Sequence, residues 1–254
     1  MNNISGFMID MDGTVYKGGN VIKGAPEFIE RLKLKKIPFV FLTNNSSSDR
    51  EHYYNKLIKM GFDVSIDNIL TSTTATAAYI KKYHPGKTVY PVGTPKFVSE
   101  IIGMGLTVTD IDPDIVLLSF DTTITYEKIN NAYQFLKNGA EFIATHPDDL
   151  CPTEDGYDID IGPFIRMLES MTSTKATVIG KPNVLMVKMA AETMNVPQEE
   201  TVMIGDRIYT DIKMASDAGI RSIMVLTGEA REDDLKEHKI RPTVIVSSVD
   251  HILK

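Results

Sequence analysis

The chain has 254 residues, 43% of them apolar and 24% charged, and its 27 Lys and Arg against 34 Asp and Glu give a formal net charge of −7. These values are typical of a globular protein with one large domain or two smaller ones. The acidic balance argues against a nucleic-acid polymer or a membrane as the main partner, because both attract clustered Lys and Arg. A small anionic substrate is compatible with it, since a few local donors outweigh the net charge.

The cysteine content and the N-terminus both bear on the compartment. Cys151 is the single cysteine, so no intramolecular disulfide forms and no oxidising compartment is needed. Residues Met1–Gly6 lack the basic region and the long apolar run of a signal peptide, and no apolar run approaches the roughly 18 residues of a membrane span. We therefore expect a cytoplasmic protein that is neither secreted nor inserted into a membrane.

Short apolar runs alternate with amphipathic stretches in the N-terminal part, as in strands joined by crossover helices. The expected strands are Ile4–Ile9 and Pro38–Thr43, and the expected helices run from Gly24 to about Lys36 and from Ser48 to Met60. Pro26 suits the first turn of the first of these helices, because the N–H that proline lacks is not needed there. Gly61 suits a left-handed stop after the second helix.

The C-terminal part repeats this alternation. We expect a helix over Asn183–Met194, a helix ending near Gly219, and strands at Thr201–Ile204, Arg221–Leu226 and Thr243–Val246. The middle of the chain has its own strand candidates at Thr88–Val92, Ile115–Phe120 and Glu141–Ala144, and helices at Pro95–Met104 and Thr125–Asn138. The predicted fold is α/β: a Rossmann-like, doubly wound parallel sheet over 1–76 and 179–254, with a large inserted α/β domain over 77–178.

The strongest chemical signal is Asp10-Met11-Asp12-Gly13-Thr14, directly after the first strand. Side chains at the carboxyl end of such a strand point into the crevice where ligands bind. Two carboxylates there repel each other unless a positive charge lies nearby, and oxygen-only ligands suit Mg²⁺. On this motif alone a simple Asx-type turn is equally compatible.

A second acidic group, Gly205-Asp206-Arg207 with Asp211, follows the apolar run Val202–Ile204. The spacing predicts Asp206 near a metal ion and Asp211 behind it as support. Helix capping by aspartate would explain either residue singly. It does not explain an acidic cluster at two strand ends.

Two weaker signals are Thr43-Asn44-Asn45 at the end of the second strand and Gly180-Lys181-Pro182 after an apolar run ending at Ile179. Thr-Asn-Asn is ordinarily a turn, and most lysines are surface charges. Taken together, however, four strand ends of one sheet are predicted to deliver carboxylates, a hydroxyl and an ammonium group in the order Asp, Thr, Lys, Asp.

This conjunction resembles the haloacid dehalogenase (HAD) superfamily of phosphatases, with all four of its motifs present. The strings Ser119–Tyr126, Ala144–Asp148 and Gly180–Asn183 resemble the NagD-like branch, subfamily IIA, which includes p-nitrophenyl phosphatases. The resemblance implies a phosphatase that hydrolyses small phosphate monoesters, such as sugar phosphates, nucleoside monophosphates or p-nitrophenyl phosphate, through an aspartyl-phosphate. The inserted domain would then be a cap over the substrate.

The resemblance also implies roles for individual residues. Asp10 would be the nucleophile, and Asp12 the general acid and base. Mg²⁺ would be held by Asp10, the backbone carbonyl of Asp12, and Asp206, with Asp211 orienting them from behind. Phosphate would be bound by Thr43, Asn44, Asn45 and Lys181. Some relatives pair through their caps, so we expect a homodimer.

Other readings remain open at this point. A phosphomutase would use the same Asp10 and Asp12 chemistry, and a phospho-accepting receiver domain also places Asp, Thr and Lys at strand ends. Receivers are about half this length and lack the large insertion. His146, in one of the NagD-like strings, is the one histidine considered for a substrate contact. Where relatives carry small residues and glycines before the last cap helix, this chain has Tyr157–Gly162, whose acidic residues would disfavour highly charged substrates if they face the pocket.

Overall fold

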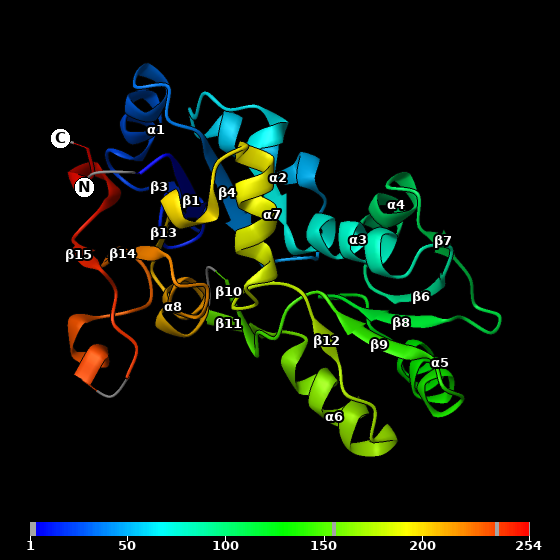
Figure 1. The fold of residues 1–254 in the computed structure, drawn as a ribbon. Coiled ribbons are helices and arrows are strands. Elements are labelled where there is room, and N and C mark those ends of the chain that lie inside the picture. The colour runs from blue at the N-terminus through cyan, green and yellow to red at the C-terminus, as the bar shows by residue number, and fades with distance from the viewer. Residues whose placement is uncertain (1–3, 154–155, 237–238, 254) are drawn as a thin grey trace. The chain divides into compact units, whose positions relative to one another are not determined.

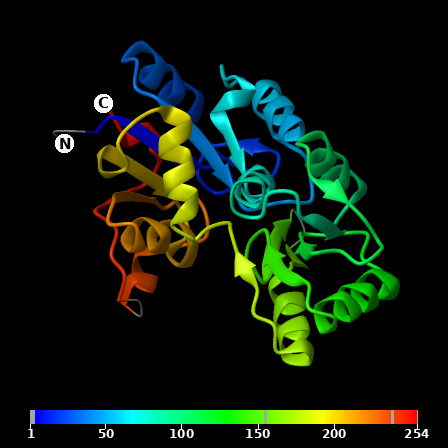
Figure 2. The ribbon, with the colours of Figure 1, turned by 45° about the vertical axis from the view of Figure 1, so that its right-hand side comes forward.

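The computed structural model describes residues 4–153, 156–236 and 239–253. The chain forms two compact units, each built of parallel strands and helices (Figure 1, Figure 2). The first unit comprises Met1–Thr43, Glu51–Leu70 and Lys181–Lys254, and the second comprises Asn44–Arg50 and Thr71–Gly180.

The first unit contains a six-stranded sheet in the order β15-β14-β13-β1-β4-β5. These strands are β1 (Gly6–Asp10), β4 (Phe39–Thr43), β5 (Ile69–Thr71), β13 (Thr201–Gly205), β14 (Arg221–Val225) and β15 (Val244–Val246). β1 is central and pairs in parallel with β13 and β4, with Ile9 level with Ile204 and Asp10 level with Leu42. Both strands flanking β1 are wholly buried, as expected of a parallel sheet covered on both faces.

The helices of the first unit are α1 (Ala25–Leu34), α2 (Arg50–Lys59, whose first residue belongs to the second unit), α7 (Leu185–Met194) and α8 (Lys213–Asp217). Phe7 and Ile9 of β1 share a core cluster with residues of α1 and α2. Successive residues of a strand face opposite sides of the sheet, so Gly6 faces the side opposite to Phe7. A Cβ at Gly6 would lie against Met194 of α7. Helices therefore cover both faces, which confirms the predicted doubly wound α/β fold.

Short elements complete the first unit. They are the hairpin β2 (Tyr16–Lys17) and β3 (Asn20–Val21), four 3₁₀ turns, η1 (Ile66–Asn68), η2 (Gln198–Glu200), η4 (Glu232–Lys236) and η5 (Val249–His251), and one π-helical turn, η3 (Ile208–Ile212). The π-helical turn follows β13 directly and leads into α8. π-helical turns are rare and are frequent at functional sites.

The second unit has a five-stranded sheet in the order β12-β9-β8-β6-β7, in which every neighbouring pair is parallel. Its strands are β6 (Thr88–Val92), β7 (Thr107–Val108), β8 (Ile115–Leu118), β9 (Glu141–Ala144) and β12 (Thr177–Val178). Its helices are α3 (Ser72–Tyr83), α4 (Pro95–Gly103), α5 (Tyr126–Lys137) and α6 (Gly162–Thr172), and β10 (Leu150–Thr153) and β11 (Gly156–Ile159) form an antiparallel hairpin. This unit has its own core cluster, built from the strands, α5 and α6.

One expectation about the sheet is wrong. The strand before Lys181 was predicted to end at Ile179 in the same sheet as the strand of Asp10, but β12 pairs with β9 in the second unit. Lys181 therefore comes from the segment that precedes α7, not from a strand end of the six-stranded sheet. The long segment of the second unit begins at Thr71, because α3 packs against α4 of that unit.

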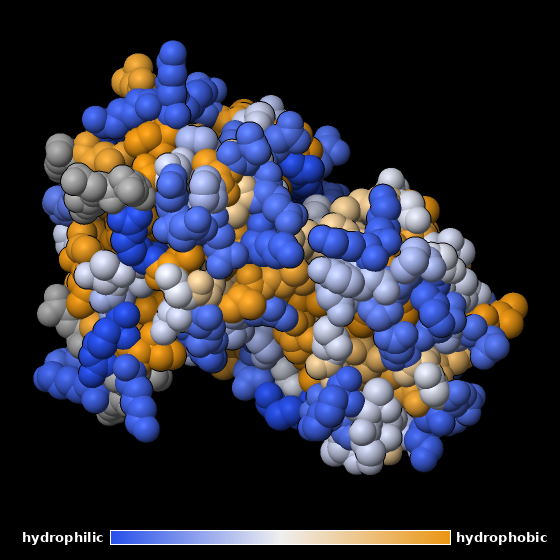
Figure 3. Space-filling model, viewed as in Figure 1, coloured by the Kyte–Doolittle hydropathy of each residue, from blue (hydrophilic) through white to orange (hydrophobic). Residues whose placement is uncertain are grey.

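Hydrophilic residues cover much of the face of both units shown in Figure 3, while the large apolar side chains are mostly buried. Among the described residues, no helix has the length and apolar composition needed to cross a membrane.

Candidate active site

Asp10 ends β1 and is only 8% exposed. One oxygen of its carboxylate accepts a hydrogen bond from the ammonium group of Lys181, and the other accepts one from Thr14 Oγ1 at 3.3 Å. Thr14 reaches Asp10 because the chain turns tightly after β1, where the N–H groups of Thr14 and Val15 both donate to the carbonyl of Met11. A buried carboxylate is thus held by one charged donor and one neutral donor.

Asp206 and Asp211 lie close to Asp10 in the first unit. All three are buried, and one carboxylate oxygen of each lies within 4.8 Å of the others. Asp206 Oδ2 accepts the N–H of Glu229 at 2.7 Å, whereas its Oδ1 is buried with no hydrogen-bond partner among the described residues. Asp211, on the π-helical turn, accepts from Lys181 Nζ at 2.7 Å and from the N–H of Arg207 at 3.2 Å.

The charged groups of this cluster shift one another's pKa values. Burial opposes the charge on Lys181, but Asp10 and Asp211 outweigh it and hold the pKa of Lys181 above its ordinary value. Burial, together with the charges of Asp10 and Asp211, raises the pKa of Asp206 well above its usual range. Three buried carboxylates thus lie together, with Lys181 in contact with Asp10 and Asp211 and the charge of Arg207 also acting on Asp206 and Asp211.

A divalent cation fits this site. The donors are all carboxylate oxygen atoms, and Asp206 Oδ1 is a buried oxygen without a hydrogen-bond partner among the described residues. The two oxygens of Asp211 accept from Lys181 and from the N–H of Arg207, four residues earlier in the chain, and a supporting role behind the metal stays a prediction.

Asp12 lies two residues beyond the end of β1, where its backbone bridges to Tyr16. Burial raises the pKa of the Asp12 carboxyl above its ordinary value, although the charge of Lys56 and a hydrogen bond from the backbone of Gly18 act in the opposite direction. A raised pKa favours the protonated form that a general acid needs.

Two glycines make room for Asp206. A Cβ at Gly13, whose φ is +88°, would collide with the Asp206 carboxylate, and a Cβ at Gly228 would collide with the same group from another side. Gly13 is thus required twice, once for its left-handed backbone and once for the close approach of Asp206.

Thr43 ends β4 next to Leu42, which is paired with Asp10 across the sheet, and it is buried. Asn44 and Asn45 belong to the second unit. There Asn44 Nδ2 donates to Asp148 Oδ1 at 3.1 Å, and Asn45 Oδ1 accepts the N–H of Ser47 at 3.0 Å. The first unit therefore contains Asp10, Asp12, Thr43, Lys181, Asp206 and Asp211, and the roles expected of these six residues and of Asn44 and Asn45 all stay predictions.

Sequence reasoning assigned no role to Thr14 or to the N–H of Glu229. Thr14 stands in the Asp10–Thr14 string, and a hydroxyl four residues after the first aspartate was the available signal. Glu229 lies in the loop after β14, where Gly228 after a buried strand indicated a close backbone approach. Neither signal is specific without the sheet order.

Comparisons with known proteins identify the family of this chain. The sequence model described as haloacid dehalogenase-like hydrolase matches residues 7–107, and one described as HAD-hydrolase-like matches residues 178–252. An acid sugar phosphatase from Staphylococcus saprophyticus is 32% identical over 100% of this chain and 98% of its own length. The chain belongs to the haloacid dehalogenase-like hydrolases.

Solved structures of HAD proteins have the same fold. The 4-nitrophenylphosphatase of Thermotoga maritima matches with a TM-score of 0.94 and 39% identity, over 98% of this chain and 95% of that one. NagD from Escherichia coli K-12 matches with a TM-score of 0.91 and 32% identity, over 98% of both chains. The predicted NagD-like branch and the predicted enzyme class, a HAD-type phosphoric monoester hydrolase, are confirmed. HAD phosphatases generally use a divalent metal ion, in agreement with the oxygen donors around Asp206.

Proposed function

We propose that this HAD hydrolase is a Mg²⁺-dependent phosphatase that hydrolyses small phosphate monoesters through a phosphorylated Asp10. One observation carries the proposal: the buried Asp10 carboxylate contacts Lys181 close to the buried carboxylates of Asp206 and Asp211. A nucleophile needs that placement, because the phosphoryl group it attacks is itself negative and must be met by positive charge.

In the first half of the reaction, a carboxylate oxygen of Asp10 attacks phosphorus and the bond from phosphorus to the ester oxygen breaks. Asp12 gives its proton to the leaving oxygen, so that the alcohol departs neutral. Burial, which raises the pKa of Asp12, keeps that proton available at a higher pH than in an exposed aspartate.

In the second half, Asp12 is a carboxylate and takes a proton from water. The oxygen of that water attacks phosphorus, the bond from phosphorus to Asp10 breaks, and inorganic phosphate leaves. Asp10 is then a carboxylate again and Asp12 is protonated, which is the starting state.

The remaining residues bind and orient. Lys181 and the Thr43 hydroxyl would hold phosphoryl oxygens, with Asn44 and Asn45 supplying further donors. When bound, Mg²⁺ supplies positive charge to the phosphoryl group; Asp10, the backbone carbonyl of Asp12, and Asp206 would hold it, with Asp211 behind them.

We assign the second unit the role of a cap, because an aspartyl-phosphate must be protected from untimely water and the substrate must be selected. Sugar phosphates are the first substrate class to test, since an acid sugar phosphatase is among the relatives that match the whole chain. A cytoplasmic location and a homodimer stay predictions.

The test is the release of p-nitrophenol from p-nitrophenyl phosphate by the full chain. We expect turnover with Mg²⁺, loss of turnover with EDTA and recovery when Mg²⁺ is restored. Asp10→Asn should lower kcat by at least about 10⁴-fold, because the nucleophile is gone. A rapid acid quench with a ³²P-labelled sugar phosphate should place label on the wild-type chain and none on the variant.

Asp121→Asn is the matched control. It makes the same change at a buried strand-end aspartate of the second unit that is paired with Lys128, so kcat per folded molecule should stay within about twofold of wild type. Turnover that survives Asp10→Asn, or that is indifferent to EDTA, would contradict the proposal.

A further inference from the structure

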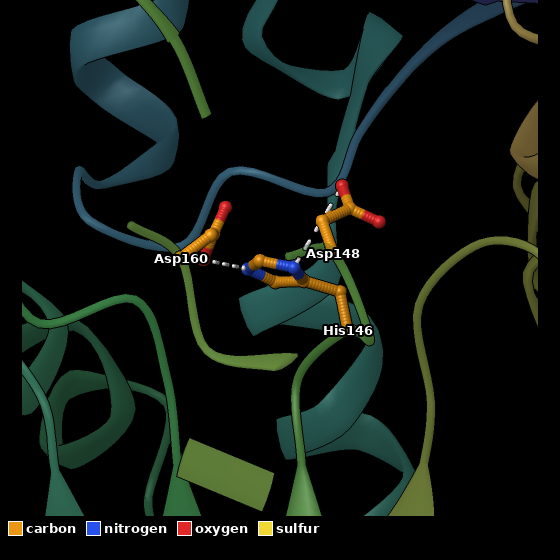
Figure 4. Close-up of side chains that lie close together, drawn as sticks. All are labelled: His146, Asp148 and Asp160. Atoms are coloured by element: carbon orange, nitrogen blue, oxygen red, sulfur yellow. Dashed lines mark ion pairs between the residues drawn. The ribbon is translucent and has the colours of Figure 1, made fainter. Parts of the chain in front are cut away.

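His146 lies directly after β9 in the second unit, and none of its side chain is exposed. Neither ring nitrogen has a hydrogen-bond partner among the described residues. Each nitrogen instead faces a carboxylate, with Nδ1 3.8 Å from Asp148 Oδ2 and Nε2 3.6 Å from Asp160 Oδ1 (Figure 4). Asp160, from the acidic stretch Tyr157–Gly162, is itself 3% exposed.

The arrangement selects a protonation state. A neutral imidazole has one N–H and one lone pair, so one of the two carboxylates would face a lone pair. That contact is repulsive, and in a buried place it is not screened by water. A ring that carries a proton on both nitrogens donates toward Asp148 at one end and Asp160 at the other.

A bound metal ion fits less well, although His146, Asp148 and Asp160 offer three ligand atoms within 4.8 Å of one another. An ion can take one ring nitrogen only, and the two carboxylates face different nitrogens at opposite ends of the ring (Figure 4). Asp148 also accepts from Asn44, and Asp160 Oδ1 accepts the N–H of Ile161; beside these contacts the ring itself can carry a positive charge between the two carboxylates.

The cluster also includes Asn44 and Gly180, two boundary residues of the second unit. Asn44 follows Thr43 of the first unit, and Gly180 precedes Lys181 of the first unit. Asp148 accepts two hydrogen bonds from Asn44 Nδ2, at 3.1 and 3.2 Å. The carbonyl of Thr145 accepts the N–H of Gly180 at 2.7 Å. A Cβ at Gly180 would meet the Thr145 carbonyl, the Asn44 side chain and His146, so the four residues are closely packed.

We propose that His146 is a positioning residue: as a doubly protonated imidazolium between Asp148 and Asp160, it fixes Asn44 and Gly180. These two residues are joined by peptide bonds to Thr43 and Lys181, which hold the phosphoryl group in the proposed reaction, and the inference rests on that function. The imidazolium therefore acts on catalysis through the backbone on either side of these two residues, without touching the substrate.

Nitrogen-15 NMR of the histidine rings in the wild-type protein tests the protonation state. We expect one histidine with a proton on each ring nitrogen at neutral pH and slow exchange with water, and His146→Asn should remove its signals. Addition of Zn²⁺ to the Mg²⁺-loaded protein should leave them unchanged. A ring with one lone pair, or a shift of one nitrogen on binding Zn²⁺, would overturn the proposal.

Kinetics of p-nitrophenyl phosphate hydrolysis test the positioning role. Because a misplacement of about 1 Å can cost about a hundredfold, His146→Asn should lower kcat/KM per active site by tenfold to a hundredfold. Active sites are counted by titration with a phosphate analogue such as vanadate, since a merely structural role would reduce their number and leave kcat/KM per site unchanged. A value within about twofold of wild type would overturn the proposal.

His84→Asn is the matched control, because His84 also contacts one carboxylate in the second unit, Glu141 at 3.3 Å, but lies outside this cluster. It should leave kcat/KM unchanged. If His146→Asn does not fold, Asp160→Asn replaces it and should lower kcat/KM by at least about threefold. A wild-type protein without turnover would refute the proposed function, while the ring signals would still report the state of His146.

Discussion

The six-stranded sheet of the first unit and the five-stranded sheet of the second both end their parallel strands in buried polar residues. In the first unit, Asp10 ends β1 and Asp206 follows β13. Both carboxylates lie close to Asp211, and Lys181 contacts Asp10 and Asp211. In the second unit, Asp121 comes after β8, and its two oxygens accept from Lys128 Nζ at 2.7 Å and from the N–H of Thr123 at 2.8 Å. Asp206 therefore keeps a buried oxygen without a partner among the described residues, whereas both oxygens of Asp121 are paired.

The difference teaches that a strand end alone does not mark an active site. Buried polar groups are normally satisfied, and Asp121 obeys that rule. Asp206 breaks it with one oxygen that lacks a partner and a pKa raised by burial and by its neighbours. A buried carboxylate oxygen without a partner, together with a raised pKa, is the feature that indicates a bound cation and a catalytic site.

Asp206→Asn should give the largest effect. It should lower the activity and raise the stability of the protein. We expect kcat to fall at least a hundredfold, because a metal-holding carboxylate is lost. Measured by urea unfolding in EDTA at neutral pH, the variant should be more stable than wild type by about 1 to 2 kcal/mol, since a buried repulsion disappears.

Asp121→Asn should change the stability in the opposite direction and leave the activity unchanged. It leaves turnover per folded molecule unchanged but lowers the free energy of unfolding by about 1 to 3 kcal/mol, because Lys128 loses its buried partner. Loss of stability in both variants would show that the first unit has no buried repulsion to relieve, and the comparison between the sheets would fail.

Comparing Gly13→Ala with Gly61→Ala distinguishes two effects of a new methyl group: strain in the backbone and a collision with Asp206. Both glycines have nearly the same left-handed φ, +88° and +86°, but only Gly13 has a carboxylate where the new methyl group would lie. Each alanine should cost about 1 kcal/mol of stability for the backbone conformation. Gly13→Ala should also reduce kcat/KM for p-nitrophenyl phosphate by at least about tenfold, because Asp206 must move. Equal activity in the two variants would mean that the position of Asp206 is not critical.

Much of this architecture is predictable from the sequence. The long apolar runs give β1, β4, β13 and β14 to within two residues, because strands buried on both faces lack polar interruptions. The short strand β7 was not predicted, since two residues carry no periodicity. The strand ending near Ile179 was predicted, but its pairing with β9 was not. Helix α3 was not predicted either. Its first half, Ser72–Ala77, is rich in threonine and buried on almost all sides, so the sequence shows no apolar stripe there.

The site was predictable as a set of residues but not as a geometry. The aspartates and Lys181 are found by their place after apolar runs, yet nothing in the sequence says that Lys181 bridges Asp10 and Asp211. One of the two carboxylates that face His146 was equally hard to predict, because Asp160 lies 14 residues away along the chain across the β10–β11 hairpin. Pair contacts of this kind depend on the sheet order, which local patterns do not specify.

The smallest effect concerns a paired charge at the amino edge of the second sheet. Asp114 accepts from Lys87 Nζ at 2.8 Å and from the N–H of Thr88 at 2.8 Å, and these contacts lower the pKa of Asp114 to about 2. A carboxyl whose pKa is lower in the folded than in the unfolded chain stabilises the fold above the unfolded value, and that contribution is lost as the pH falls through the folded value.

Asp114→Asn should therefore lower the urea midpoint at pH 6, and the difference from wild type should be clearly smaller at pH 3, between the folded pKa of about 2 and the ordinary value of 3.8. Asp110→Asn, the same change of charge four residues earlier on the surface, should show no such narrowing. A difference that stays constant from pH 6 to pH 3 would mean that the ionised carboxylate is not what Lys87 and Thr88 stabilise. In that case Asp114 would not be an example of a carboxylate whose charge is paired in the second unit.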